Sequence, residues 1–285
     1  MAMDERGLGK QLQSARQAAG LTQQALCQRA NLSFSTLTKI ERGAIKSPSI
    51  FTIQAIAGAL NMSLDALMGS ASRTITAQRQ LKTTKSGVKF VYFDVNGCLI
   101  RFYQRAFGQI AEANDIPVDI VETAFWHFND AACRGEFTPD DFNQALAKRI
   151  GIPELDWAGY YLAAAEKIDE MYELVRWTAD HYKVGLLTNI MPGLLQQLKS
   201  LDKVPALPYD ATVDSSELGT IKPETAIYAV AEERAGVDPS QILFIDDTKA
   251  NLTAVEARGW HVIWFDYGRP AESAAEIRKA LEPSA

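Results

Sequence analysis

The hydrophobic positions of the chain follow a helical spacing at first and a strand-like spacing further on. From residue 7 to residue 69, short amphipathic segments alternate with tight turns. Thr22 and Ser33 are placed as helix caps, and Gly20 and Gly43 as helix stops. The pattern predicts five helices, in residues 10–20, 22–30, 33–43, 47–61 and 63–68.

From residue 88 onward, short apolar runs rich in β-branched and aromatic residues are separated by helical patterns. This alternation is typical of parallel strands joined by crossover helices, and it predicts a doubly wound α/β sheet. Such sheets bind ligands at the carboxyl ends of their strands. The expected strands are VKFVYF (88–93), VGLLTN (184–189), DATVD (210–214), QILFID (241–246) and HVIWF (261–265).

Two boundaries complete the predicted organisation. Residues 70–86 are polar and basic without a sustained apolar period, which indicates a linker between an all-α domain (1–69) and an α/β domain (87–285). About 80 residues separate the first two strands, which is more than one crossover helix needs. Because several stretches there have helical patterns, we expect an inserted helical cap over residues 103–170.

Charge is distributed unevenly between the two expected domains. The 285-residue chain has a formal net charge of −6, but residues 1–86 contain 11 Lys and Arg against 4 Asp and Glu. This part therefore has a net charge of +7 and the remainder −13. The asymmetry indicates that only the N-terminal part binds a polyanion.

The composition disfavours membrane and secreted classes. No apolar stretch approaches the roughly 18 residues of a membrane-spanning helix. The start of the chain, MAMDERGLGKQ, lacks the apolar core of a secretion signal, so we expect a cytoplasmic protein without membrane contact. Cys27, Cys98 and Cys133 are far apart and form no CxxC pair, which argues against disulfides or a zinc site.

Residues 21–43, LTQQALCQRANLSFSTLTKIERG, resemble the helix-turn-helix of phage repressors and Xre-type regulators. With the closing ALNMSLDAL (59–67), the likeness covers about 60 residues. The resemblance implies a recognition helix in the major groove of double-stranded DNA, and a homodimer on two half-sites. The alternative is a protein-interaction domain whose basic residues are only solvated.

The helical register predicts the side chains that would contact DNA. Those expected to face the bases are Phe34, Ser35, Thr38 and Lys39. Those expected to contact phosphates are Gln23, which matches a family position, and Arg42 and Lys46. Because a phenyl ring cannot form bidentate hydrogen bonds, Phe34 would read a thymine methyl group or DNA shape, with modest base specificity.

Four segments resemble the motifs of the haloacid dehalogenase (HAD) superfamily, in the same order, over nearly all of residues 88–268. They are FDVNGCL with Asp94, LLTN with Thr188, GTIKPE with Lys222, and LFIDDTKAN with Asp246 and Asp247. The resemblance implies a phosphate site with Asp94 as nucleophile. It also implies that Mg²⁺ is held by Asp94, the main-chain carbonyl of Asn96 and Asp247, with Asp246 in support.

The remaining polar residues of these motifs are expected to bind the phosphate. Lys222 precedes a proline at a helix start, where the helix dipole disfavours a cation, so a structural role explains it poorly. It would instead pair with Asp94 and a phosphate oxygen. Thr188 would donate its hydroxyl to the same phosphate, with Asn189 beside it. The alternative for Thr188 is a simple turn residue.

Asn96 departs from the family pattern, in which this position is an aspartate acid/base. An amide can neither protonate a leaving oxygen nor deprotonate water, and this loss costs about 10²- to 10⁴-fold in rate. Three interpretations stay open: a regulator that senses a phosphorylated small molecule by occupancy, a slow or specialised phosphatase, and a dehalogenase. The pair Asp246 and Asp247 favours the metal-binding forms, so the dehalogenase ranks last.

The leading hypothesis is a DNA-binding transcriptional regulator with a ligand-binding HAD-like domain. The alternative is a magnesium-dependent phosphatase of sugar phosphates or nucleotides, whose helical domain serves localisation or dimerisation. In the expected cap, His127 and Arg134 are the preferred ligand contacts because they are polar. The other candidates, most of them expected to be core, are Trp126, Phe128, Tyr160, Tyr161 and Tyr172.

Overall fold

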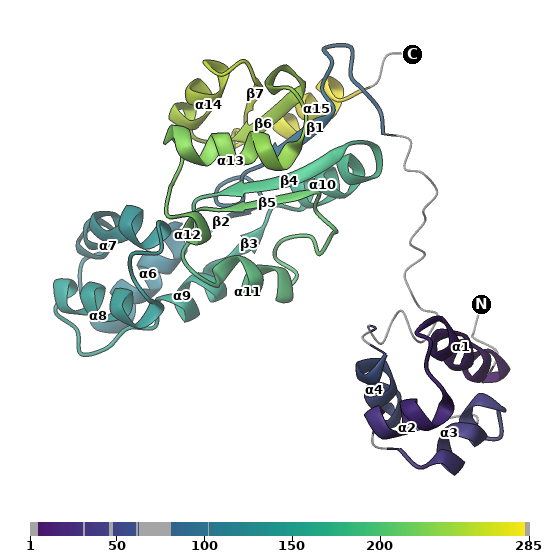
Figure 1. The fold of residues 1–285 in the computed structure, drawn as a ribbon. Coiled ribbons are helices and arrows are strands. Elements are labelled where there is room, and N and C mark those ends of the chain that lie inside the picture. The colour runs from purple at the N-terminus through teal and green to yellow at the C-terminus, as the bar shows by residue number, and fades with distance from the viewer. Residues whose placement is uncertain are drawn as a thin grey trace. The chain divides into compact units, whose positions relative to one another are not determined.

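A computed structural model describes residues 5–30, 32–45, 48–60, 62, 81–101 and 103–282. The chain divides into two compact units between residues 79 and 80. The described part of the first unit is helical, and the second unit is α/β (Figure 1). Within the described residues, no helix has the length and apolar character needed to span a membrane.

Short helices surround a small apolar core in the N-terminal unit. The described helices are α1 (Glu5–Ala18), α2 (Gln23–Ala30), α3 (Phe34–Glu41) and α4 (Ile50–Ala59). Ser33 caps α3 by accepting a hydrogen bond from a backbone N–H of its first turn. Gly20 and Gly43 follow helix ends with positive φ, a conformation open to glycine without strain. The expected fifth helix, residues 63–68, lies outside the described residues.

The C-terminal unit is built on a five-stranded parallel sheet. In spatial order the strands are β5 (Ala211–Asp214), β4 (Lys183–Thr188), β1 (Phe90–Phe93), β6 (Ile242–Asp246) and β7 (His261–Trp264). Phe93 is in register with Leu186 and Ile245, so the residue that follows β1 lies level with the ends of β4 and β6. The predicted parallel α/β sheet is confirmed.

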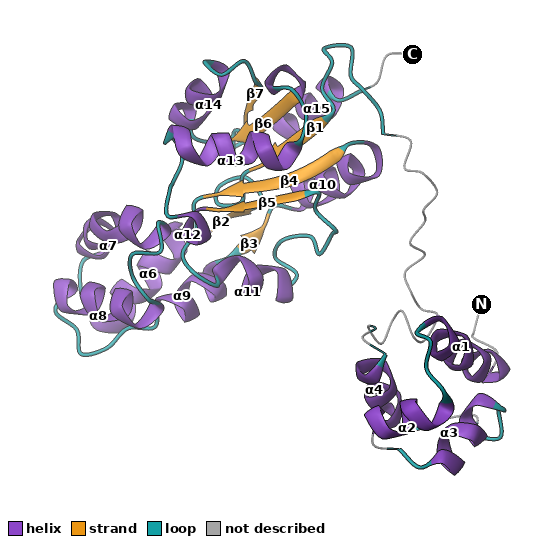
Figure 2. Ribbon diagram, in the orientation of Figure 1, coloured by secondary structure: helices purple, strands orange, loops and turns teal. Residues whose placement is uncertain are grey.

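Helices cover both faces of this sheet, as Figure 2 shows. They are α10 (Asp169–His181), α11 (Leu194–Ser200), α13 (Thr225–Ala235), α14 (Lys249–Glu256) and α15 (Pro270–Ala280), with the short α12 (Ser215–Leu218) and the 3₁₀ turn η1 (Pro239–Gln241). Val91 and Phe93 pack with residues of α10, α11 and α15. Phe90 and Tyr92 pack with residues of α13 and α14. Successive residues of β1 therefore pack on opposite faces of the sheet, as the two-residue period of a strand requires.

A helical segment, residues 103–164, lies between β1 and β4 in the chain. It consists of α6 (Tyr103–Asn114), α7 (Val118–Cys133), α8 (Pro139–Ile150) and α9 (Trp157–Ala164). The chain enters it through β2 (Ile100–Arg101) and leaves it through β3 (Glu166–Lys167), and these two strands pair antiparallel. That the segment acts as a cap stays a prediction.

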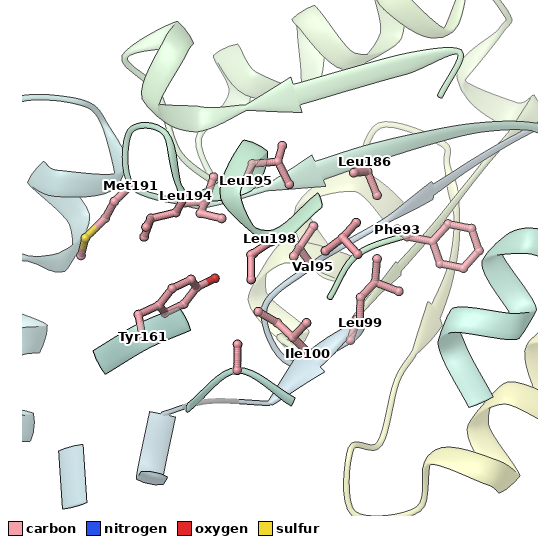
Figure 3. Packing of buried hydrophobic residues seen from close by; sticks show 14 of the residues in the cluster. Phe93, Val95, Leu99, Ile100, Tyr161, Leu186, Met191, Leu194, Leu195 and Leu198 are labelled. Carbon is pink, nitrogen blue, oxygen red and sulfur yellow. The ribbon is translucent and has the colours of Figure 1, made fainter. Parts of the chain in front are cut away.

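The loop after β1 is anchored in the main apolar core. Val95, Leu99 and Ile100 are almost completely buried. Figure 3 shows them beside leucines of β4 and α11, with Tyr161 and Met191 at the other end of the drawn cluster from Phe93. This packing fixes the loop whose polar residues are described next.

Candidate functional site

Four polar residues meet at the carboxyl edge of the sheet. Asp94 follows β1, Thr188 ends β4, Asp246 ends β6, and Lys222 stands in the loop before α13. All four are more than nine-tenths buried. The structure therefore brings together residues from all four motifs quoted from the sequence.

Lys222 is the centre of this buried group. Its Nζ donates to Asp94 Oδ1 at 2.6 Å and to Asp246 Oδ2 at 2.7 Å. Burial alone would lower the pKa of Lys222, but Asp246 and Asp94 hold that pKa above its ordinary value. Asp246 also accepts hydrogen bonds from the Thr248 backbone N–H and the Asn251 amide. Both of its carboxylate oxygens thus accept hydrogen bonds from the protein, and one of them holds Lys222.

Asp247 adds a third carboxylate to the group. A carboxylate oxygen of Asp247, one of Asp94 and the Sγ of Cys98 all lie within 4.8 Å of one another. Gly97 permits this approach, because a Cβ at that position would lie 2.2 Å from Asp247 Oδ2. Burial raises the pKa of Asp94, and the charge and hydrogen bond of Lys222 oppose that rise. Burial also raises the pKa of the Cys98 thiol; the spacing of the cysteines in the sequence did not place Cys98 at this site.

The charge balance of this group fits a divalent cation. Three carboxylates, those of Asp94, Asp246 and Asp247, surround one ammonium, that of Lys222. The carboxylates of Asp94 and Asp247 are close enough to share one ion, and oxygen donors suit Mg²⁺. These two residues, with the main-chain carbonyl of Asn96 in the same loop, are the candidate ligands.

The hydroxyl of Thr188 is buried and has no hydrogen-bond partner among the described residues. Such a group costs about 1–3 kcal/mol unless a ligand or water satisfies it. The neighbouring Asn189 differs, because its side chain is fully engaged. Its Oδ1 accepts from the Lys222 backbone N–H at 2.8 Å, and its Nδ2 donates to the Lys222 carbonyl at 2.9 Å. The Asn189 amide thus holds the Lys222 loop against β4.

The side-chain amide of Asn96 is held at both ends. Its Nδ2 donates to the backbone carbonyl of Asn189 at 3.0 Å. Its Oδ1 accepts from the hydroxyl of Tyr161, on α9, at 2.8 Å. Burial raises the pKa of Tyr161, which keeps this hydroxyl protonated. Tyr161 was one of several aromatic candidates in the sequence, and nothing in the spacing distinguished it.

A cavity of about 770 Å³ lies between this group and the helical segment. From α7 its lining includes Phe125, Trp126, Asn129, Asp130 and Cys133. His127 is exposed and is not part of the lining. Each residue turns the helix by about 100°, which rotates position 127 away from the face that positions 126, 129, 130 and 133 share. The structure therefore does not support His127 as a ligand contact.

Of the other candidates in the helical segment, Arg134 and Tyr161 line the cavity, whereas Tyr160 does not. Arg134 forms an ion pair with Glu224, with Nε and Oε1 3.1 Å apart. Hydrogen bonds from Thr220 and from Arg134 lower the pKa of Glu224 to about 2. Arg134 is therefore a link between the helical segment and the Lys222 loop.

The expected DNA-contacting residues are distributed around α2 and α3. Phe34 is 51% exposed, and Ser35, Lys39 and Arg42 are exposed as well. Gln23 donates to Glu41 Oε2 at 2.7 Å, within a network that includes the buried Arg16. The hydroxyl oxygen of Thr38 is buried, so Thr38 does not offer it to a base edge. Lys46 lies outside the described residues.

Comparison with protein families identifies both units. Residues 88–259 match the haloacid dehalogenase-like hydrolase family, and residues 12–67 match a helix-turn-helix family. The "Immunity repressor protein" of Bacillus phage phi105 is 40% identical over 62 residues, which are 22% of this chain and 42% of that protein. "Acyl-CoA dehydrogenase family member 10" of Mus musculus is 24% identical over 219 residues, 72% of this chain and 20% of that protein. The chain thus matches less than half the length of either relative.

Solved structures agree with the fold of the C-terminal unit. A HAD family enzyme from Bacteroides thetaiotaomicron, in complex with magnesium and inorganic phosphate, has a TM-score of 0.54 and 22% identity, covering 64% of this chain and 96% of its own. A predicted HAD-like family hydrolase from Porphyromonas gingivalis has a TM-score of 0.55 and 22% identity, covering 68% and 98%. The chain belongs to the haloacid dehalogenase-like hydrolase family and has a helix-turn-helix region of the Xre type at its N-terminal end.

Proposed function

We propose that the protein is a DNA-binding transcriptional regulator whose HAD-like domain binds Mg²⁺ and a phosphorylated small molecule, with weak or absent phosphatase activity. The proposal includes the domains 1–69 and 87–285, a linker at 70–86, and a cytoplasmic homodimer on paired half-sites. The observation that carries it is the amide of Asn96, which has neither an acidic proton to transfer nor a basic atom to accept one. Occupancy of the site, rather than rapid turnover, would then be the signal.

The site residues have distinct tasks in this proposal. Lys222 and Thr188 would bind the phosphate, since Lys222 supplies positive charge and the Thr188 hydroxyl has no other described partner. Asp94 and Asp247, with the Asn96 carbonyl, would hold Mg²⁺, which neutralises charge on the phosphate. The helical segment would act as a cap, with Arg134 and Tyr161 facing the ligand cavity.

The DNA-binding part rests on the exposed side of α3. Phe34, Ser35 and Lys39 would face the major groove, and Arg42 and Gln23 would contact phosphates. Because the Gln23 amide already donates to Glu41, the network that holds it would fix its orientation toward the backbone.

The second candidate function is a magnesium-dependent phosphatase that uses its helix-turn-helix only for localisation or dimerisation. The contact between the would-be nucleophile Asp94 and Lys222 favours it, because this pair is intact. Rapid hydrolysis of a natural sugar phosphate or nucleotide by the full-length protein would decide for this alternative.

Two binding measurements on the full chain test the proposal. Calorimetry with Mg²⁺ and inorganic phosphate should give binding that Thr188→Val weakens. A labelled DNA duplex should bind with an affinity that falls steeply as salt rises. The proposal is wrong if phosphate does not bind, and it is equally wrong if no DNA duplex binds.

A further inference from the structure

The site retains the groups that form a bond between aspartate and phosphorus but lacks a group that would hydrolyse it. Asp94 is a buried carboxylate held by Lys222, and the Thr188 hydroxyl has no hydrogen-bond partner among the described residues. Asn96 replaces the acid/base. We propose that Asp94 takes a phosphoryl group from an acyl phosphate and retains it, so that the protein carries a long-lived covalent mark. This inference rests on the proposed function, whose ligand site it specifies.

Because the site has no general acid at Asn96, it can use only phosphoryl donors whose leaving group needs no proton. In the first step a carboxylate oxygen of Asp94 forms a bond to phosphorus, and the bond from phosphorus to the leaving oxygen breaks with its electron pair on that oxygen. An alkoxide leaving group is about as basic as hydroxide, whose conjugate acid has a pKa of roughly 15.7, and needs a proton from an acid. A carboxylate, with a conjugate acid pKa of about 4, needs none. An acyl phosphate therefore reacts where a sugar phosphate does not.

The second step is blocked by the lack of a base. To hydrolyse the aspartyl phosphate, water must lose a proton as it attacks phosphorus. No histidine lines the cavity in the part of the chain that the structure describes. Among the lining carboxylates, Glu224 is tied to Arg134 and Thr220, Asp247 belongs to the candidate cation group, and Asp130 is an exposed residue of α7. None occupies the place of Asn96.

The surroundings of Asn96 are matched to an amide. Its Nδ2 donates to the carbonyl of Asn189, and its Oδ1 accepts from Tyr161. Turning the amide over would bring Oδ1 against a carbonyl oxygen, so the observed orientation is fixed. A carboxylate in the same place would lose the bond to Asn189 unless it were protonated. The position is thus matched to a neutral group that donates to Asn189 and accepts from Tyr161.

The cavity has space for more than a phosphoryl group. Part of its wall is apolar or aromatic and includes Phe125, Trp157, Ile190, Met191 and Leu194. The acyl part of a donor can lie against this wall while its phosphate meets Lys222. After the carboxylate leaves, the phosphoryl group on Asp94 remains beside Lys222 and Thr188, whose hydroxyl then gains a partner.

The test uses the full-length protein with Mg²⁺ and acetyl phosphate radiolabelled in its phosphoryl group. After rapid removal of donor, the label on the protein is followed over time, and intact mass spectrometry counts the phosphoryl groups. We expect one group per chain, none on Asp94→Asn, and a lifetime about 10²- to 10⁴-fold shorter on Asn96→Asp. Asn143→Asp is the matched control, since among the described residues Asn143, on α8, only accepts through its Oδ1, from the Trp157 backbone N–H. Its label should persist as in the parent.

The outcomes separate this inference from the proposed function. If phosphate and Mg²⁺ bind by calorimetry but no label is retained, the covalent mark is excluded and sensing by occupancy stands. If the label decays as fast on the parent as on Asn96→Asp, a base acts elsewhere and the inference fails in favour of a phosphatase. If neither phosphate binding nor labelling occurs, both proposals fall. Label on Asp94→Asn would mean a different acceptor and would also overturn the inference.

Discussion

Tyr161 donates its hydroxyl hydrogen to Asn96 Oδ1 at 2.8 Å, and this bond joins helix α9 to the loop after β1. Both partners line the cavity that also contains Asp94. The bond means that the position of the helical segment and the orientation of the Asn96 amide are coupled. A movement of the helical segment would therefore change the orientation of the Asn96 amide through this hydrogen bond, and the reverse also holds.

Tyr161→Phe should reduce the free energy of unfolding by about 0.5–1.5 kcal/mol, because it removes this hydrogen bond while keeping the ring. Urea unfolding of the full chain measures the change. Tyr160→Phe is the matched control, since Tyr160 is a neighbour on the same helix outside the cavity, and it should leave the stability nearly unchanged. Equal effects of both changes would mean that the Asn96 bond contributes nothing.

Asn96→Asp should raise the hydrolysis of a phosphate ester with an alcohol leaving group by about 10²- to 10⁴-fold, because it supplies the missing acid and base. Phosphate release is the measurement, and the gain must vanish in the double change with Asp94→Asn. No gain would mean that the rest of the site is incompetent.

The same substitution should make stability depend on pH. The carbonyl of Asn189, which now accepts from Asn96 Nδ2, would repel an ionised carboxylate, so the introduced carboxyl has a raised pKa in the folded state. The contribution of this carboxyl to the free energy of unfolding is then fully present below the ordinary carboxyl pKa of about 4. It is lost as pH rises through the raised pKa. Unfolding of variant and parent from pH 4 to 8 checks the direction.

Thr188→Val should weaken phosphate binding by about tenfold or more and yet leave the ligand-free protein equally or more stable. The hydroxyl has no described partner to lose, and a bond from it to a charged phosphate contributes about 1.5–3 kcal/mol. Thr178→Val is the control, because the Thr178 hydroxyl donates to the Leu174 carbonyl at 2.7 Å. It should destabilise the fold without changing phosphate affinity.

The ion pair between Arg134 and Glu224 should stabilise the fold near neutral pH and fail in strong acid. The pKa of Glu224 is lowered to about 2. The contribution of this carboxylate to the free energy of unfolding is therefore fully present above the ordinary glutamate pKa of about 4.3, and it disappears as pH falls through about 2. A double-mutant cycle of Arg134→Gln and Glu224→Gln, repeated from pH 7 downward, measures the coupling. A coupling that is absent at pH 7 would contradict the prediction.

Lys39→Ala should weaken DNA binding, because Lys39 is exposed on α3. If it contacts a phosphate, the slope of log K against log salt should become shallower by about one ion. If it contacts a base, discrimination among sequences should relax instead. Fluorescence anisotropy with a mixed-sequence duplex measures the slope, and Lys183→Ala, the same charge change in β4, is the control. Equal losses in both variants would indicate a nonspecific charge effect.

The sequence was sufficient to predict the parallel sheet. It was also sufficient to predict that the polar residues at the ends of the strands lie close together. Each strand is a compact apolar run, and Asp94, Thr188 and Asp246 follow or end such runs, so a parallel sheet must bring them to one edge.

Contacts between side chains that are distant in the chain could not be predicted from the sequence. The partner of Asn96, Tyr161, is distant in the chain, and several aromatic residues had the same local character. The Asn189 amide was expected at the phosphate but binds the Lys222 backbone. His127 was preferred because it is polar, whereas the phase of α7 decides which residues face the cavity. In each case the contact depends on where the side chain points in the folded protein, and the residue type alone does not give that direction.

The two-residue strands β2 and β3 have a consequence for how this protein can change over evolution. Ile100 pairs with Lys167 and Arg101 with Glu166, so the chain enters the helical segment and leaves it at adjacent points about 5 Å apart. A module whose ends meet in this way can be lengthened, shortened or exchanged without moving any strand of the sheet. New ligand preferences can therefore arise by replacing residues 103–164 while the groups around Asp94 stay where they are.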